Sequence, residues 1–269
     1  MTSAQPRREV GSRLVLEVDD PTAFVLAASV AQGVPTTEES LRVRLGDQPI
    51  QVREIDDGHG TRLRLFETQP GLLTIEYAAT VVGRSARAGI DDLDLVTYLR
   101  PSRYVQSDGL TDRARDLFGG TSGIDRVLAV EQWVHDNLSY TPEMSFPTGG
   151  ALETLDLGAG VCRDFAHVTA AFLRGLDVPA RMVSVYAPGL QPRDFHAVIE
   201  AYVDNRWIVV DATRLAPRRS LVRIATGRDA TDTAFLTNTL ADVRLITLDV
   251  RATSDEDLTD DPSEIVELS

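Results

Sequence analysis

The chain has 269 residues, 43% of them apolar and 25% charged, which is typical of a soluble protein with one large or two modest domains. No apolar run approaches the roughly 18 residues that a membrane span needs, and no signal-peptide core is recognisable near the N-terminus. The net charge of −14 argues against nucleic acid or an anionic membrane as a partner, because neutralising phosphates requires clustered cations.

All 27 basic residues are arginine. A phosphate-binding P-loop and a pyridoxal phosphate enzyme each need a lysine, so both classes are excluded. The single cysteine excludes an internal disulfide and suits a reducing compartment, so a cytoplasmic location is expected. The four histidines are scattered and show no zinc spacing. We therefore expect neither a metal nor a cofactor.

Residues 1–90 show period-2 alternation of apolar side chains in the segments 14–18, 41–45, 62–65 and 73–81. This alternation predicts half-buried antiparallel strands. The sequence Asp-Asp-Gly-His-Gly at 56–60 predicts a hairpin turn. We expect an N-terminal antiparallel β-sandwich-like domain without a chemical constellation of its own.

Residues 91–105 are expected to form a linker. Helical periodicity follows in the segment 111–118 and in a longer helix that begins at Ser122, with Asp125 as a weak capping box. A short segment at 151–157 then leads toward the cysteine. His135 lies off the buried stripe of this longer helix, so a solvated role is expected for it.

Cys162 follows a glycine-bearing loop, and the apolar residues after it recur every three or four positions as far as Leu176. The cysteine is therefore predicted at a helix N-terminus, where free N–H groups and the helix dipole favour a thiolate anion. A buried, inert thiol is the alternative, because free cysteine is among the most buried residue types.

Strands are predicted over 180–186, 195–203 and 206–213, with Asp204-Asn205 as a two-residue hairpin turn. In that register paired residue numbers sum to 409, so His196 and Asp211 lie on one face as diagonal neighbours. A carboxylate that holds an imidazole can support it as the base for a thiol. Together, Cys162, His196 and Asp211 suit nucleophilic catalysis.

Several stretches resemble the bacterial transglutaminase-like superfamily. The stretch Gly-Val-Cys-Arg-Asp-Phe-Ala-His at 160–167 resembles its cysteine motif, and the family's order continues with Val-Pro-Ala-Arg at 178–181, Asp-Phe-His-Ala at 194–197 and Asp-Ala-Thr at 211–213. Further similarity lies at 98–104, at 222–230 and in the N-terminal strands. Asp-Ala-Thr stands where Asp-Pro-Thr is common. The Arg-Gly-Gly run that precedes the cysteine of arylamine N-acetyltransferases is absent.

The resemblance implies an α+β fold with a papain-like core, in which the cysteine lies on a helix and His and Asp lie on an antiparallel sheet. It implies Cys162 as nucleophile, His196 as general base and acid, and Asp211 as the carboxylate that orients it. The expected domains are 1–90, a catalytic domain at 106–252, and an acidic flexible tail at 253–269.

The expected function is a thiol-dependent amide-bond enzyme that acts on a peptide or amide through a thioester. Water as the acceptor would make it a peptidase or amidase, whereas an amine would make it a transamidase. A peptide-modifying enzyme that works with partner ligases and a non-catalytic binding module are the alternatives. For the other polar residues near the motifs, structural roles are expected for Arg163, Asp164 and His167, while Arg228 and Asp229 could line the cleft.

Overall fold

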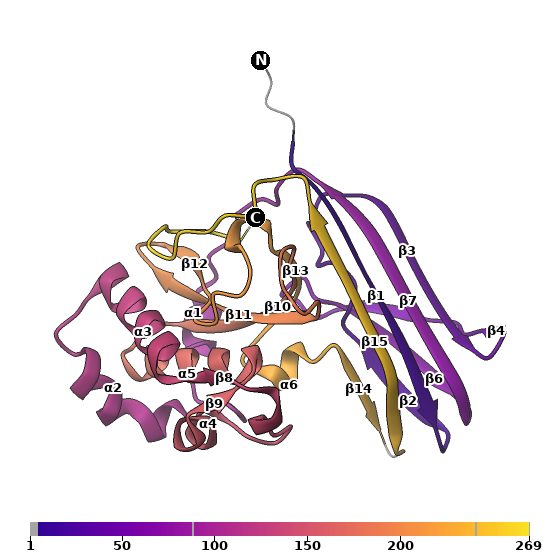
Figure 1. Ribbon diagram of the computed structural model, residues 1–269, viewed down its shortest axis with the longest axis horizontal. Helices are drawn as coiled ribbons and strands as arrows, with labels where there is room; N and C mark the ends of the chain where they lie inside the picture. Colours follow the sequence, from indigo (N-terminus) through magenta and orange to yellow (C-terminus); the bar gives the residue numbers. More distant parts are fainter. Residues whose placement is uncertain (1–4, 88, 240, 269) are drawn as a thin grey trace.

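The apolar alternation at the start of the chain builds a five-stranded antiparallel sheet (Figure 1). The computed structural model describes residues 5–87, 89–239 and 241–268. In spatial order, the strands of this sheet are β15 (Val243–Ser254), β1 (Arg7–Val18), β7 (Gly71–Val82), β3 (Thr36–Leu45) and β4 (Gln48–Pro49).

A second sheet packs against the inner face of the first. Its strands are β14 (Leu236–Thr239), β2 (Thr22–Leu26), β6 (Arg62–Thr68) and β5 (Arg53–Asp56). Leu14 and Ile75 from the first sheet meet Phe24 and Phe66 from the second in one apolar core. The two sheets together form the antiparallel sandwich that the sequence predicts. The predicted turn at 56–60 joins β5 to β6, with Asp56 opposite Arg62.

The last strands of the chain return to the N-terminal sheets, which differs from the expected domain boundaries. β15 pairs with β1 from Arg8–Ser254 to Val18–Val243, and β14 pairs with β2. Figure 1 shows the yellow strand β15 alongside the indigo strand β1. The strands β14 and β15 therefore complete both sheets of the sandwich, although they follow Cys162, His196 and Asp211 in sequence.

The middle of the chain supplies the helices. They are α1 (Asp92–Thr97), α2 (Thr111–Phe118), α3 (Gly123–Asn137), α4 (Ala151–Leu157), α5 (Cys162–Gly175) and α6 (Ala230–Thr233), with 3₁₀ turns at Ser107–Leu110, Pro142–Met144 and Arg218–Ser220. The expected linker at 91–105 thus contains α1. The predicted capping box at Ser122 does not form, because the Ser122 side chain makes no cap hydrogen bond.

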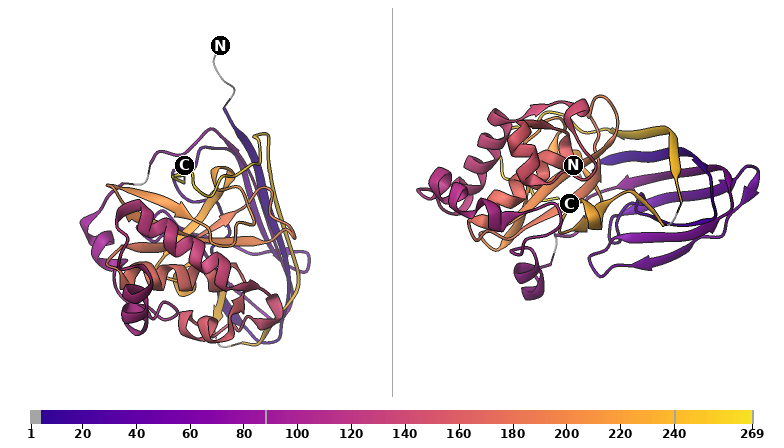
Figure 2. Two further views of the ribbon diagram at one scale, coloured as in Figure 1. Left: turned by 60° about the vertical axis from the view of Figure 1, so that its left-hand side comes forward. Right: turned by 90° about the horizontal axis from the view of Figure 1, so that it is seen from below.

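A third, four-stranded sheet has the order β12 (Arg206–Val210), β11 (Phe195–Val203), β10 (Ala180–Tyr186) and β13 (Val222–Gly227). A small parallel ladder joins β8 (Ser139–Tyr140) to β9 (Ala159–Gly160). The predicted hairpin register is confirmed, since Val203 pairs with Arg206 and Ile199 with Val210. The third predicted strand ends at Val210 rather than Thr213. Figure 2 shows the helices and this sheet beside the sandwich.

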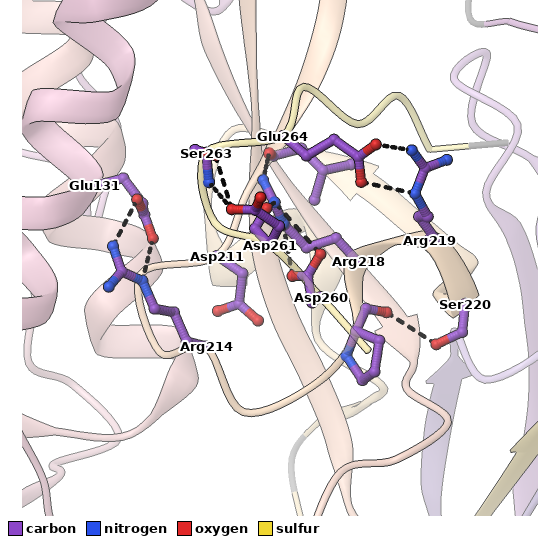
Figure 3. Close-up of polar contacts among 12 residues, drawn as sticks. Glu131, Asp211, Arg214, Arg218, Arg219, Ser220, Asp260, Asp261, Ser263 and Glu264 are labelled. Atoms are coloured by element: carbon purple, nitrogen blue, oxygen red, sulfur yellow. Dashed lines mark hydrogen bonds and ion pairs between the residues drawn. The ribbon is translucent and has the colours of Figure 1, made fainter. Parts of the chain in front are cut away.

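The acidic C-terminal segment packs on this third sheet, contrary to the expectation of a flexible tail. Val266 and Leu268 are buried, and the Val209 N–H donates to the Val266 carbonyl at 2.7 Å. Arg218 pairs with Asp260 at 2.9 Å (Figure 3). The sequence suggested a solvated run of charge, but Leu268 packs in the apolar cluster on the face of the sheet opposite α5.

No helix among the described residues is long and apolar enough to cross a membrane.

Leu268→Ala should lower the free energy of unfolding by about 2–3 kcal/mol, because it removes a side chain that is only 6% exposed from an apolar cluster. Leu258, at 40% exposure, is the matched control, and its replacement by alanine should change stability by less than about 0.5 kcal/mol. Urea unfolding measures both variants. Equal, negligible effects would mean that the C-terminal segment is not packed in solution.

Candidate active site

The helix α5 begins at Cys162, as predicted. The Asp164 carboxylate reaches back and accepts the Val161 N–H at 2.9 Å, which is one half of a capping box. A Cβ on Gly160 would lie 2.6 Å from the Asp164 side chain, so only glycine fits two residues before the cysteine. The glycine and aspartate of the motif therefore define where the helix starts.

The rest of α5 is buried on every side. Every residue from Asp164 to Gly175 is buried, and the helix packs chiefly against β11. A helix that is buried on every side lies in the centre of a domain. Cys162 itself is partly exposed at the end of this helix. The fold thus holds the thiol on a rigid element and leaves it accessible.

His196 and Asp211 lie side by side in the interior, as the hairpin register predicts. The His196 Nε2 atom is 2.8 Å from Asp211 Oδ2, and both side chains are almost fully buried. The other carboxylate oxygen, Oδ1, accepts the N–H and the hydroxyl of Thr213 at 3.0 and 2.7 Å. Because Nε2 faces the carboxylate, Nδ1 is the His196 nitrogen left to interact with the Cys162 thiol, which acts on the same imidazole.

This arrangement sets the protonation of the pair. Burial alone would lower the pKa of His196, but the charge and hydrogen bond of Asp211, together with Cys162, outweigh it and raise the pKa to about 10. Burial likewise opposes ionisation of Asp211, yet His196 and Thr213 hold the pKa of that carboxyl below its usual value. The pair is therefore an imidazolium facing a carboxylate at neutral pH.

Tyr140 is a further residue at the thiol that sequence reasoning missed. The parallel pairing of β8 with β9 places it opposite Gly160, and its hydroxyl lies close enough to Cys162 for that residue to act on the pKa of the phenol. Burial, followed by the charge of Cys162, raises the pKa of Tyr140 to about 12. No spacing signal links two residues that are 22 positions apart and meet through a two-residue ladder.

The residues next to the cysteine bind the surrounding loop. Arg163 pairs with Asp164 at 2.8 Å and donates to the Phe146 carbonyl at 2.6 Å and to Ser145 Oγ at 3.1 Å. It thereby ties the segment 145–147 to the start of α5. His167 is buried and accepts the Ala230 N–H at 3.2 Å. These contacts agree with the structural roles expected for them.

Arg228 and Asp229 lie around α6, and none of their contacts includes Cys162. Asp229 caps α6 by accepting the Thr231 N–H and also accepts the Tyr104 N–H at 2.9 Å. Arg228 pairs with Asp232 at 2.8 Å. Within the described parts of the chain, no group of three or more His, Cys, Asp or Glu side chains is arranged to hold a metal.

Comparisons with known proteins agree with this architecture. The family model described as the transglutaminase-like superfamily matches residues 111–212. A Cytophaga hutchinsonii crystal structure, named a "Putative Cysteine Protease", is 32% identical with a TM-score of 0.89, over 98% of this chain and 96% of that one. The chain therefore belongs to the transglutaminase-like superfamily.

Two other similarities cover less or are more remote. An uncharacterized protein of Mycobacterium leprae (strain TN) is 32% identical over 121 residues, which are 41% of this chain and only 42% of that protein. The periplasmic domain of TgpA from Pseudomonas aeruginosa is 19% identical over 80% of this chain and 92% of its own, with a TM-score of 0.43. The latter is too remote to support inference.

The rate at which iodoacetamide alkylates Cys162 should be high below pH 7 in the wild type and fall at least tenfold in His196→Ala. Asp211 keeps His196 protonated up to about pH 10, so its imidazolium can stabilise a thiolate in that range. The chain has one cysteine, so the signal has one source. Labelling that ignores His196 and rises only in alkali would contradict the pairing.

Proposed function

We propose that this protein hydrolyses an amide bond in a peptide or a related amide through a cysteine acyl-enzyme. The observation that carries the proposal is the succession of Cys162, His196 and Asp211: His196 Nε2 lies 2.8 Å from Asp211 Oδ2, and the Cys162 thiol acts on the same imidazole. Its order is that of nucleophile, base and orienting carboxylate in thiol and serine hydrolases.

In the proposed reaction the Cys162 sulfur attacks the carbonyl carbon and forms a C–S bond. His196 then donates its proton to the amide nitrogen, the C–N bond breaks, and the amine leaves a thioester behind. Water attacks the thioester while His196 accepts its proton. The C–S bond breaks, the carboxylic acid leaves, and Cys162 is again free to attack a new substrate.

Two donors are available for the oxyanion that forms in each half of the reaction. The Cys162 N–H lies at the start of α5, where helix N–H groups lack intrahelical partners. The Tyr140 hydroxyl lies beside it. Donors already in place where charge develops contribute strongly to catalysis, so we assign Cys162 N–H and Tyr140 this role.

The surroundings of the thiol favour a peptide with an apolar side chain near the cleaved bond. Met144 and Phe146 are exposed apolar residues on the loop that Arg163 ties to the start of α5. Such side chains can cover apolar groups of a substrate. The name of the Cytophaga hutchinsonii relative, which describes a protease, also favours hydrolysis over transfer to an amine.

The proposal is tested by incubating the protein with a peptide library in water enriched in a heavy oxygen isotope, with and without a primary amine. We expect new carboxyl groups that carry the label in both reactions, and none with Cys162→Ala, which lacks the nucleophile. Mass spectrometry identifies the products. Products that form only with the amine, and contain it, would refute hydrolysis in favour of acyl transfer. Turnover by Cys162→Ala would refute the thiol mechanism.

Tyr140→Phe should lower kcat roughly 100-fold, with little change in KM, because it removes one oxyanion donor. The matched control is Tyr202→Phe. Tyr202 lies at the hairpin turn, where its hydroxyl contacts Asn205 at 3.3 Å, so its loss should leave kcat unchanged. Steady-state kinetics on the peptide found above gives both values. An unchanged kcat in Tyr140→Phe would remove Tyr140 from the mechanism.

A further inference from the structure

The helix α3 contacts the backbone that directly follows Asp211. Glu131 and His135 are four residues apart on α3, so they share one face of the helix. Glu131 is 6% exposed, and its two carboxylate oxygens accept Arg214 Nε and Nη2 at 2.8 and 3.1 Å. His135 Nδ1 lies 3.0 Å from the Ala212 carbonyl oxygen. One face of α3 therefore contacts both residue 212, through its carbonyl oxygen, and residue 214, through its guanidinium.

Arg214 has a backbone conformation that needs such support. Its φ is 56°, in the left-handed region that non-glycine residues rarely adopt. Its N–H donates to the Asp211 carbonyl at 3.2 Å, which closes a turn over residues 211–214. Unfavourable backbone conformations persist where surrounding contacts impose them, often at functional sites. The bidentate pair with Glu131 (Figure 3), joined by a hydrogen bond from Arg214 Nη2 to Gln132 Oε1 at 2.7 Å, supplies such support.

Thr213 lies between the two held residues and makes both donor contacts to Asp211 Oδ1. The direction of these two donors depends on where the backbone of residues 212–214 lies. A shift of that backbone would release Oδ1 and let the carboxylate turn away from His196. The contacts from α3 therefore act on the orientation of a group that they do not touch.

We propose that Glu131, His135 and Arg214 are positioning residues that keep the Asp211 carboxylate aligned with His196. The inference rests on the proposed function of Cys162, His196 and Asp211. It also gives His135 a role other than the solvated one that its sequence position suggests, because its ring nitrogen faces the Ala212 carbonyl.

The same loop carries a matched control farther along. Arg219 pairs with Glu264 through both carboxylate oxygens, as Arg214 does with Glu131 (Figure 3). This second pair is solvent-exposed, at 51% and 40% of the two side chains, and lies beyond the turn at 211–214. Glu264→Gln therefore removes an equivalent charge pair without disturbing the positions that flank Thr213.

The experiment compares Glu131→Gln, Arg214→Gly, Arg214→Lys and Glu264→Gln. Arg214→Gly removes the guanidinium but introduces a residue that tolerates the positive φ of this position. Arg214→Lys keeps the positive charge but cannot form the bidentate pair. We expect kcat to fall roughly 10- to 100-fold in Glu131→Gln and Arg214→Gly at constant KM, since small misplacements of catalytic groups are costly. Arg214→Lys should fall less, and Glu264→Gln should match the wild type.

A second pair of variants does not depend on the buried ion pair. His135→Asn keeps a side-chain N–H that can donate to the Ala212 carbonyl, and His135→Ala does not. We expect His135→Ala to lose activity in the same way and His135→Asn to retain more of it. If Glu131→Gln fails to fold, which circular dichroism reports, the His135 pair still tests the proposal.

The pH dependence of Cys162 alkylation separates positioning from a merely structural role, with Asp211→Asn as the reference. Glu131→Gln, Arg214→Gly and His135→Ala should each move the profile toward that of Asp211→Asn. Folded variants with wild-type profiles and wild-type kcat would overturn the inference while the proposed function stands. An Asp211→Asn variant with the same profile as the wild type would overturn both this inference and the proposed function.

Discussion

The hydrogen bond between His196 and Asp211 is the interaction on which the site depends. Two ionisable groups at 2.8 Å in the protein interior are stable only when their remaining polar atoms are satisfied. Thr213 donates two hydrogen bonds to the second oxygen of the Asp211 carboxylate. The Cys162 thiol interacts with the imidazole of His196. The proton of the pair is thereby held on the imidazole, where a departing amine would need it.

The fold places these groups by combining one buried helix with one hairpin. Almost all of α5 is buried, which fixes the position of its first residue, Cys162. The hairpin β11–β12 supplies the other two groups at its open end, far from its turn at Asp204 and Asn205. A helix packed against a sheet thus brings Cys162 together with residues that lie 34 and 49 positions after it in the chain.

Much of this arrangement could be predicted because it follows from short-range rules. Asp204 and Asn205 adopt positive φ, as a two-residue hairpin turn requires, so the register of the strands follows from the numbering alone. The start of α5 at Cys162 follows from the glycine loop and the helical spacing after it. The role of the C-terminal segment could not be predicted, because charge composition describes its exposed residues and not the buried Val266 and Leu268.

The sequence by itself determined the local elements, the hairpin register and the identity of the candidate triad, because periodicity and turn chemistry act over a few residues. Only the tertiary structure decided that β14 and β15 return to the first sheets, since strand pairing depends on which edges are left open. It also brought Tyr140 to the thiol and Glu131 to Arg214. Those contacts join elements that are distant in the chain, and their side chains meet only when the whole domain has packed.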